Sequence, residues 1–557
     1  MKVSQMPYKR VDKAEVLAKF ADLTRRFENA KTLDEAKKVI QEHDELKIDV
    51  STQFVLSYIR FTQDTRDKFY ADEKDFWDEF IPELQLADVN FTKLYVTSPL
   101  SPELRKVYPP ILFKIIELDM KANDERILKF KIEENKLTSE YTKLMSSLLI
   151  DFNGEKLPPS GMGKYMSNPD KELRKKAMFA LGEKYSEYNQ NLDDIYDKLV
   201  KNRTEQGKEM GYENYCPIGY ANMKRTCYGK EEIAAFRENV KKYFVPLVSK
   251  LKERIRVEQG WDKVMIYDEN VYTKDEPKPI GTPEEIFAAG KKMYSEMSPV
   301  CYELFTKMCE IEAFDPLSRE GKWGGGYCIS IDKYETPFII ANFNGSAGDV
   351  DVLTHEFGHA LAADRAFKIP QYAVREPAME TAEVHSMSME FLAYPWMEMF
   401  FGDKTPEYIF SHICGALSFI PYGTTVDYFQ QVCYDNPNMT PAERNAFWTK
   451  LEKEFLPHMH DEGIPFYGEG RRWQRQAHIF ESPFYYIDYC LAQFIAFEFL
   501  ALSKKDYKKA QEVYMAFLVQ GGTKPFTELV ESAGLKSPFE EESFIEIVDV
   551  IEKILKI

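Results

Sequence analysis

The sequence has few cysteines, and none of them are closely paired. Its 557 residues include eight cysteines, which are scattered and form no C-x-x-C pair. Structural zinc clusters and dithiol redox sites need such close spacing, so the sequence supports neither kind of site. Reduced thiols in a cytoplasmic protein are the simplest interpretation.

The sequence also lacks an excess of positive charge and any apolar run of membrane-spanning length. The net charge of −18 argues against nucleic acid as a partner, because a phosphate-binding surface must be basic. The longest apolar runs, such as ICGALSFIPY and LAQFIAF, fall well short of a membrane span, which needs roughly 20 residues. The N-terminus shows no apolar segment followed by a small-residue cleavage site, so we expect no secretory signal and no membrane partner.

Helical periodicity dominates what is present. Residues 13–30 and 32–46 carry apolar side chains three and four positions apart, which predicts amphipathic helices. Residues 282–299 begin with Thr282 as an N-cap, Pro283 at the first helical position and two acidic residues in the first turn. With no internal repeat and no flexible linker, the chain is predicted to be mainly α, with a deep interior.

One region has strand character instead. Residues 324–331 (GGGYCISI) and 336–343 (TPFIIANF) are rich in β-branched and aromatic residues and are separated by the turn-like DKYE. This pattern predicts a short antiparallel pair. An exposed edge strand can bind an extended peptide, and the glycines at 324–326 and 345 would let backbones approach closely, although ordinary loop glycines are the alternative.

Residues 351–364 (DVLTHEFGHALAAD) contain the pattern H-E-x-x-H. On a helix, His355 and His359 lie one turn apart on the same face, so both imidazoles can reach one Zn²⁺ ion. Glu356 is displaced around the helix, where a general base for a metal-activated water belongs. The alternative is a chance match on a core helix, expected in roughly one comparable chain in a hundred.

A catalytic zinc site needs a third protein ligand, and the following helix offers candidates. Glu380, Glu383 and Glu390 interrupt an apolar stretch that begins near Pro377. Buried carboxylates must be paired, protonated or bound to a cation, so one of them as ligand and another holding a ligand imidazole is a sensible division. His385 is predicted to pack rather than to bind metal.

The histidines are concentrated in the same part of the chain: seven of the eight lie in the segment from His355 to His478. His478 is followed by Tyr485, Tyr486 and Tyr489, the donors that a peptide hydrolase uses to stabilise an oxyanion. An aromatic helix packed in the core is the alternative. Three other histidines receive structural predictions. A solvated loop is predicted for His458 and His460, with a lid that contacts substrate as the alternative, and the core is predicted for His412.

Together these segments resemble a known family. HEFGHA, AEVHSMSMEFL and HIFESPFYYIDY, in this order within residues 320–500, resemble the thimet-oligopeptidase group of zinc metallopeptidases, and most closely oligoendopeptidase F and the Pz-peptidases. The resemblance implies one zinc on His355, His359 and Glu383, with Glu356 as general base. It also implies that Glu390 lies behind the ligands and that His478, Tyr486 and Tyr489 face the oxyanion. ESPFYY replaces the glycine-rich stretch of the animal members, so the choice among Tyr485, Tyr486 and Tyr489 stays open.

The family fold is a large helical ovoid with a deep substrate channel, and its members cleave internal bonds of short unstructured peptides. We therefore expect an N-terminal helical region, residues 1–195, that covers the channel, and a zinc peptidase catalytic region, residues 196–557. Two alternatives remain. One is a zinc carboxypeptidase that holds the substrate carboxylate with Arg471, Arg472 or Arg475, and the other is a non-catalytic peptide-binding protein with a structural zinc.

Overall fold

The predicted helices form where their capping residues lie. In the computed structural model, which describes residues 1–557, Thr32 and Thr282 cap helices α2 (Leu33–Gln63) and α14 (Pro283–Met297) through capping boxes with Glu35 and Glu285. Asp12 caps α1 (Lys13–Glu28). Helix α2 continues well past the predicted end at residue 46. Helices hold 71% of the residues, which confirms the mainly α prediction.

The remaining helices follow in chain order. They are α3 (Lys68–Thr92), α4 (Leu94–Thr97), α5 (Ser101–Val107), α6 (Pro110–Ala122), α7 (Leu128–Ser147), α8 (Gly163–Met166), α9 (Lys171–Ser186), α10 (Asn189–Glu209), α11 (Cys216–Asn222), α12 (Lys230–Asn239), α13 (Val245–Gln259), α15 (Pro299–Glu310), α16 (Gly348–Ala366), α17 (Met379–Leu392), α18 (Glu398–Phe401), α19 (Thr405–Asp435), α20 (Pro441–Phe455), α21 (Ala477–Glu481), α22 (Tyr486–Lys505), α23 (Tyr507–Leu518), α24 (Phe526–Ser532) and α25 (Glu541–Leu555).

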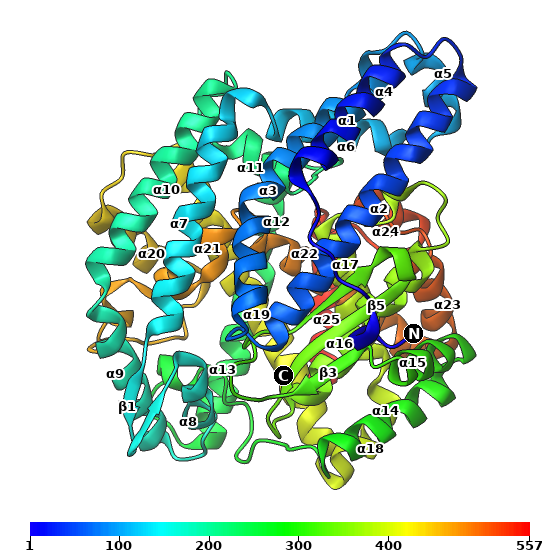
Figure 1. Ribbon diagram of the computed structural model, residues 1–557. Helices are drawn as coiled ribbons and strands as arrows, with labels where there is room; N and C mark the ends of the chain where they lie inside the picture. Colours follow the sequence, from blue (N-terminus) through cyan, green and yellow to red (C-terminus); the bar gives the residue numbers. More distant parts are fainter.

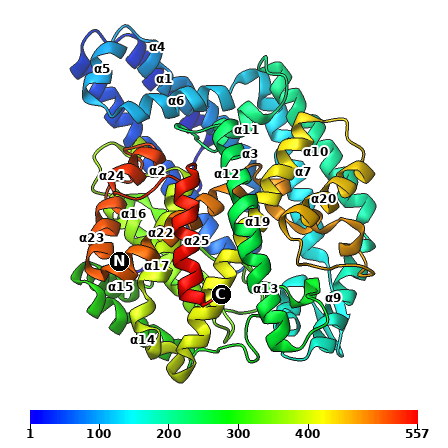
Figure 2. The same ribbon diagram turned by 180° about the vertical axis from the view of Figure 1, so that it is seen from behind.

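The N-terminal helices form an arm on a larger body. Helices α1, α4 and α5 project from the top of the molecule, while α7, α9 and α10 lie on one side of the body and the sheet lies on the other (Figures 1 and 2). A cluster of 18 buried apolar residues joins the arm to the end of α16 through Ala366, Ile369 and Val374, and it is separate from the 112-residue core of the body. The division of the chain at residue 195 stays a prediction.

A three-stranded sheet lies beside the H-E-x-x-H helix. Strands β4 (Tyr327–Ile331) and β5 (Thr336–Phe343) pair antiparallel, with Tyr327 opposite Ile340, as predicted. A third strand, β3 (Phe314–Leu317), runs parallel to β5 and was not predicted, because it is short and contains a proline at an irregular step in the register. The order β3-β5-β4 leaves one edge of β4 free. A separate hairpin joins β1 (Ile150–Phe152) and β2 (Glu155–Leu157).

Helix α22 carries more apolar length than the sequence runs suggested. By length and composition alone it is the one helix that could cross a membrane, and 67% of its most apolar window is buried inside the protein. This burial is what the core helix of a folded domain shows, and α22 lies in the middle of the body (Figure 2).

Helices α16 and α17 touch backbone to backbone at the motif. A Cβ atom added at Gly358, inside H-E-F-G-H, would lie 2.6 Å from the carbonyl oxygen of His385 and 2.7 Å from the Cα of Ser386. Only a glycine permits this approach. The close crossing brings the acidic face of α17 onto the histidine face of α16.

Candidate active site

Three of the predicted ligands meet where α16 crosses α17. One donor atom each from His355, His359 and Glu383 lies within 4.8 Å of the others. The Oε2 atom of Glu383 is 3.4 Å from Nε2 of His355 and 3.6 Å from Nε2 of His359. Two imidazole nitrogens and one carboxylate form the donor set of a catalytic zinc site, which keeps its fourth position open. The residues therefore fit a zinc ion.

A chain of hydrogen bonds holds the imidazole of His355 through its Nδ1 atom. Its Nδ1 lies 2.6 Å from Oε1 of Glu390, and Oε2 of Glu390 lies 2.8 Å from Nε2 of His412. The Nδ1 of His412 in turn lies 2.7 Å from the hydroxyl of Tyr394. Burial raises the pKa of Glu390, but the contacts with His355 and His412 outweigh it and lower this pKa to about 2. The ionised carboxylate orients His355 with Nε2 free for metal.

His412 was predicted as a core residue and is instead a polar member of this chain. It is 22 residues from Glu390, on α19, so only the packing of α19 against α17 brings the two together. His385 is buried as predicted, and burial lowers its pKa to about 3.

Glu390→Gln tests the contribution of this chain. The amide keeps the size of the side chain but loses the charge on which His355 and His412 depend, so we expect zinc affinity to fall about 10–100-fold. Competition with a chromogenic chelator measures the change. Glu380→Gln is the matched control on the same helix: burial raises the pKa of Glu380, and its Oε2 atom has no hydrogen-bond partner, so it supports none of the three ligands and zinc affinity should not change. Equal losses in both variants would contradict a specific role for Glu390.

Glu356 lines the cavity along β4 beside the three clustered ligands. Its side chain is buried, and its Oε2 atom has no hydrogen-bond partner in the protein. Its Oε1 atom lies 3.7 Å from where a Cβ would stand on Gly326. Burial raises the pKa of Glu356, and the neighbouring His355 and His359 oppose this shift. An unpaired carboxylate oxygen at this place is suited to accept a proton from water.

His478 lies across the site on α21 in a defined tautomer. Its Nδ1 lies 2.9 Å from the amide nitrogen of Gln476, and the Oε1 of Gln476 accepts a hydrogen bond of 2.9 Å from the hydroxyl of Tyr422. Burial lowers the pKa of His478, so the ring is neutral. Since Nδ1 accepts a hydrogen bond, Nε2 carries the proton and can donate it.

The three candidate tyrosines occupy different places. The hydroxyl of Tyr485 donates to Oε1 of Glu383 at 3.0 Å, which ties it to the ligand carboxylate. Tyr489 lies 4.8 Å from Tyr485 and 5.9 Å from His478, measured between ring centres. Tyr486 lies 5.0 Å from His478. Of the three, Tyr489 lines the cavities on both sides of the cluster.

This geometry separates the effects of three phenylalanine variants. Tyr489→Phe should lower kcat most, by roughly 10²-fold, the cost of removing one oxyanion donor. Tyr485→Phe should lower zinc affinity instead, because it removes the donor to Glu383. Tyr486→Phe should lower kcat by a smaller factor than Tyr489→Phe. Steady-state kinetics at saturating zinc separates the three, and a larger kcat loss for Tyr486→Phe would reverse the assignment.

The loop that carries Tyr485 is held by residues that sequence reasoning missed. Phe484 has a left-handed backbone with φ of 68°. Its N–H donates to Oε1 of Gln430 at 3.1 Å, and its carbonyl accepts from Nη2 of Arg225 at 2.6 Å. No local signal reveals these contacts, because Gln430 and Arg225 lie 54 and 259 residues away in the chain.

Two cavities meet at the cluster. Each has a volume of about 530 Å³, and both are lined by His355 and Tyr489. One extends along α19 and includes His478 and Tyr486, while the other runs along β4, from Gly326 to Ser330, and includes the other members of the cluster. The predicted channel is therefore present, and the free edge of β4 forms part of its wall.

Other predicted residues lie away from the cluster. His458 is not solvated, because its Nδ1 is enclosed and burial lowers its pKa to about 4. The backbone of His460 bridges to Val264 and Ile266 instead of forming a free loop. Among the candidate arginines, Arg471 pairs with Asp193 at 3.0 Å and Arg472 with Glu269 at 2.7 Å. Arg475 is exposed and has no ion pair.

Comparisons with known proteins also indicate a peptidase. The description "Peptidase M3 N-terminal domain" matches residues 3–123, and "Peptidase family M3" matches residues 164–548. The chain is 23% identical over 428 residues to oligopeptidase PepF of Bacillus subtilis (strain 168), an alignment that covers 73% of this chain and 61% of that protein. The chain therefore spans about three fifths of the length of this relative.

Solved structures are more similar. The structure of Pz peptidase A with an inhibitor is 40% identical with a TM-score of 0.96, covering 100% of this chain and 99% of the other. A protein from Bacillus anthracis str. Ames, described as an oligoendopeptidase F, is 39% identical with a TM-score of 0.92, covering 100% and 98%. The resemblance inferred from the three sequence segments is confirmed, and the chain belongs to peptidase family M3.

Proposed function

We propose that this protein is a zinc-dependent oligopeptidase that hydrolyses internal bonds of short unstructured peptides. The observation that carries the proposal is the His355, His359 and Glu383 cluster with Glu356 beside it, at the junction of two cavities. We further propose one zinc per chain and a cytoplasmic location.

Each residue has a defined part in the proposed mechanism. A zinc ion held by His355, His359 and Glu383 would supply a Lewis acid that activates water and polarises the scissile carbonyl. Glu356 accepts the proton of the attacking water and returns it to the leaving amine. His478, through Nε2–H, and a tyrosine hydroxyl, for which Tyr489 is best placed, donate hydrogen bonds to the developing oxyanion.

The position of the cluster favours short and flexible substrates. The catalytic residues lie where two cavities meet, and the His355 and His359 side chains are only 23% and 21% exposed, so an unfolded peptide can reach Glu356 more easily than a folded protein can. The free edge of β4 offers unpaired backbone groups along one of these cavities. An extended peptide can pair with this edge and align its scissile bond with the cluster.

A carboxypeptidase is the alternative function, and it is less well supported. Arg475 is the one candidate arginine without an ion pair, but it lines neither of the two cavities at the cluster. Peptides with an amidated C-terminus separate the two functions, because an endopeptidase still cleaves them. A non-catalytic peptide-binding protein is less well supported, since a closed structural zinc site needs neither an open position nor a general base.

Digestion of a graded set of end-blocked peptides tests the proposal. The set runs from a few residues to a folded protein, with and without a chelator, and mass spectrometry identifies the products. We expect internal cuts in the short peptides only, lost with chelator and restored by zinc. Single-residue trimming of unblocked peptides alone would favour the carboxypeptidase, and no cleavage by the zinc-loaded protein would reject both enzymes.

A further inference from the structure

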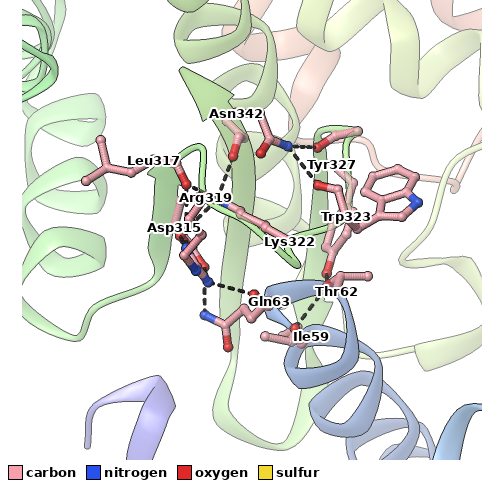
Figure 3. Close-up of polar contacts among 12 residues, drawn as sticks. Ile59, Thr62, Gln63, Asp315, Leu317, Arg319, Lys322, Trp323, Tyr327 and Asn342 are labelled. Carbon is pink, nitrogen blue, oxygen red and sulfur yellow. Dashed lines mark hydrogen bonds and ion pairs between the residues drawn. The ribbon is translucent and has the colours of Figure 1, made fainter. Parts of the chain in front are cut away.

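The segment between β3 and β4 leads directly into the free edge of the sheet. It crosses from Leu317 to Tyr327 and ends in three consecutive glycines, Gly324 to Gly326. Gly326 lies against Glu356, so the conformation of this loop determines which backbone groups lie next to the general base. Figure 3 shows the polar side chains that hold it.

A buried lysine anchors the loop to the sheet. The side chain of Lys322 is completely buried, and its ammonium group donates to the carbonyls of Asp315, Leu317 and Ala341 at 2.7, 2.9 and 2.6 Å (Figure 3). The carboxylate of Asp315 lies 2.9 Å away. Burial lowers the pKa of Lys322, and Asp315 opposes this shift. A buried ammonium group is stable only when its N–H groups are all paired, so the side chain of Lys322 is confined to this one position.

Contacts with α2 and β5 fix the rest of the loop. The N–H of Trp323 donates to the carbonyl of Thr62 at 2.9 Å, and the N–H of Thr65 donates to the carbonyl of Gly321 at 2.7 Å. The amide of Asn342 donates to the carbonyls of Trp323 and Gly325 at 2.9 and 2.8 Å (Figure 3). The loop backbone is therefore held from both sides.

On this fixed loop, a large aromatic side chain remains exposed. The indole of Trp323 is 39% exposed and lies 6.0 Å from the ring of Tyr327, which lines the cavity along β4. A Cβ atom at Gly325 would lie 2.0 Å from the indole, so the ring rests directly on the glycine backbone. Figure 3 shows the indole on the outer side of β4, away from β5, where a strand added to this edge would lie.

We propose that Trp323, together with Tyr327, forms a subsite for an apolar side chain of the peptide bound along β4. This inference rests on the proposed peptidase function. Trp323 precedes Gly326 by three residues, and the bend at Gly324 keeps the two closer than the roughly 10 Å that three residues span when extended. The preferred side chain, aromatic or large aliphatic, therefore lies within about three residues of the scissile bond. The rigid backbone and the glycine under the indole present the ring without an ordering cost at binding.

Peptides that carry phenylalanine or alanine at each of four positions on either side of the cleaved bond test the subsite. For the wild-type protein, we expect kcat/KM to favour phenylalanine at one position within about three residues of the bond, by roughly tenfold or more. In Trp323→Ala this ratio should fall toward one, and in Trp323→Phe it should largely persist. Tyr302→Ala is the matched control, because Tyr302 is a similarly exposed aromatic residue, 40% exposed, on α15.

A mutant cycle tests the placement of the ring. Gly325→Ala should displace the indole and lower the phenylalanine preference, whereas the same change in the Trp323→Ala background should have no further effect. A ratio that Trp323→Ala leaves unchanged, or equal losses with the phenylalanine and alanine peptides, would overturn the subsite while leaving the peptidase intact. Failure of the wild-type protein to cleave any of these peptides would reject the proposed function and the subsite with it.

Discussion

Replacing Glu356 by glutamine should lower kcat by roughly 10²–10⁴-fold, the range for loss of a general acid–base group. Glutamine has the same length and shape but cannot accept the proton of the attacking water. Because Glu356 is not among the three clustered ligands, the variant should bind zinc with unchanged affinity. Its KM should stay near the wild-type value, since the carboxylate pairs with nothing else in the protein through Oε2.

Kinetics and zinc content must be measured on the same preparation. Glu380→Gln again serves as the control, because it makes the same replacement at another buried glutamate near the cluster. Near-normal turnover in Glu356→Gln would remove Glu356 from the mechanism. Loss of zinc together with turnover would mean that Glu356 supports the metal site instead of acting as a base.

The second large effect is expected at Gly358. An alanine there would press its Cβ against the backbone of α17 at His385 and Ser386, and a helix backbone cannot move as a side-chain tip can. Forcing α16 and α17 apart should cost about 1–3 kcal/mol of stability, as overpacking usually does. It should also move Glu383 away from His355 and His359, so zinc affinity should fall with stability.

Gly348→Ala is the matched control for this prediction. Gly348 begins the same helix, and a Cβ there would meet only the Ser346 hydroxyl at 3.4 Å, an ordinary contact. Denaturant unfolding with and without zinc measures both effects. Wild-type stability and zinc affinity in Gly358→Ala would show that the crossing of α16 and α17 is looser than the geometry indicates.

Local rules were enough to predict many elements of this fold. The predicted cap at Thr282 placed the start of α14 correctly, the apolar periodicity of residues 32–46 placed the start of α2, and the richness in β-branched and aromatic residues placed β4 and β5. The ligand cluster was predictable only in part from local rules. The four-residue spacing put His355 and His359 on one helix face, but it left Glu380, Glu383 and Glu390 open as the third ligand, and the choice of Glu383 came from the family resemblance.

The parts that sequence reasoning missed depend on long-range packing. The hydrogen bonds from His355 through Glu390 to His412 form only because α19 lies against α17. The backbone of Phe484 is fixed by a hydrogen bond from Arg225, which lies far upstream in the sequence. In neither case do the residue types or their spacing in the sequence predict the contact. Strand β3 was missed because a parallel partner of four residues with an internal proline carries almost no local strand signal.

The most direct test of the zinc site is a titration of the metal-free protein with zinc, with the cleavage rate of one short end-blocked peptide as the readout. We expect no cleavage at the start, a linear rise, and a plateau at one zinc per chain. We also expect Glu383→Ala to need far more zinc to reach any rate. Undiminished cleavage by the metal-free protein, or a Glu383→Ala curve identical to that of the wild type, would contradict the claim that these three residues hold a catalytic metal.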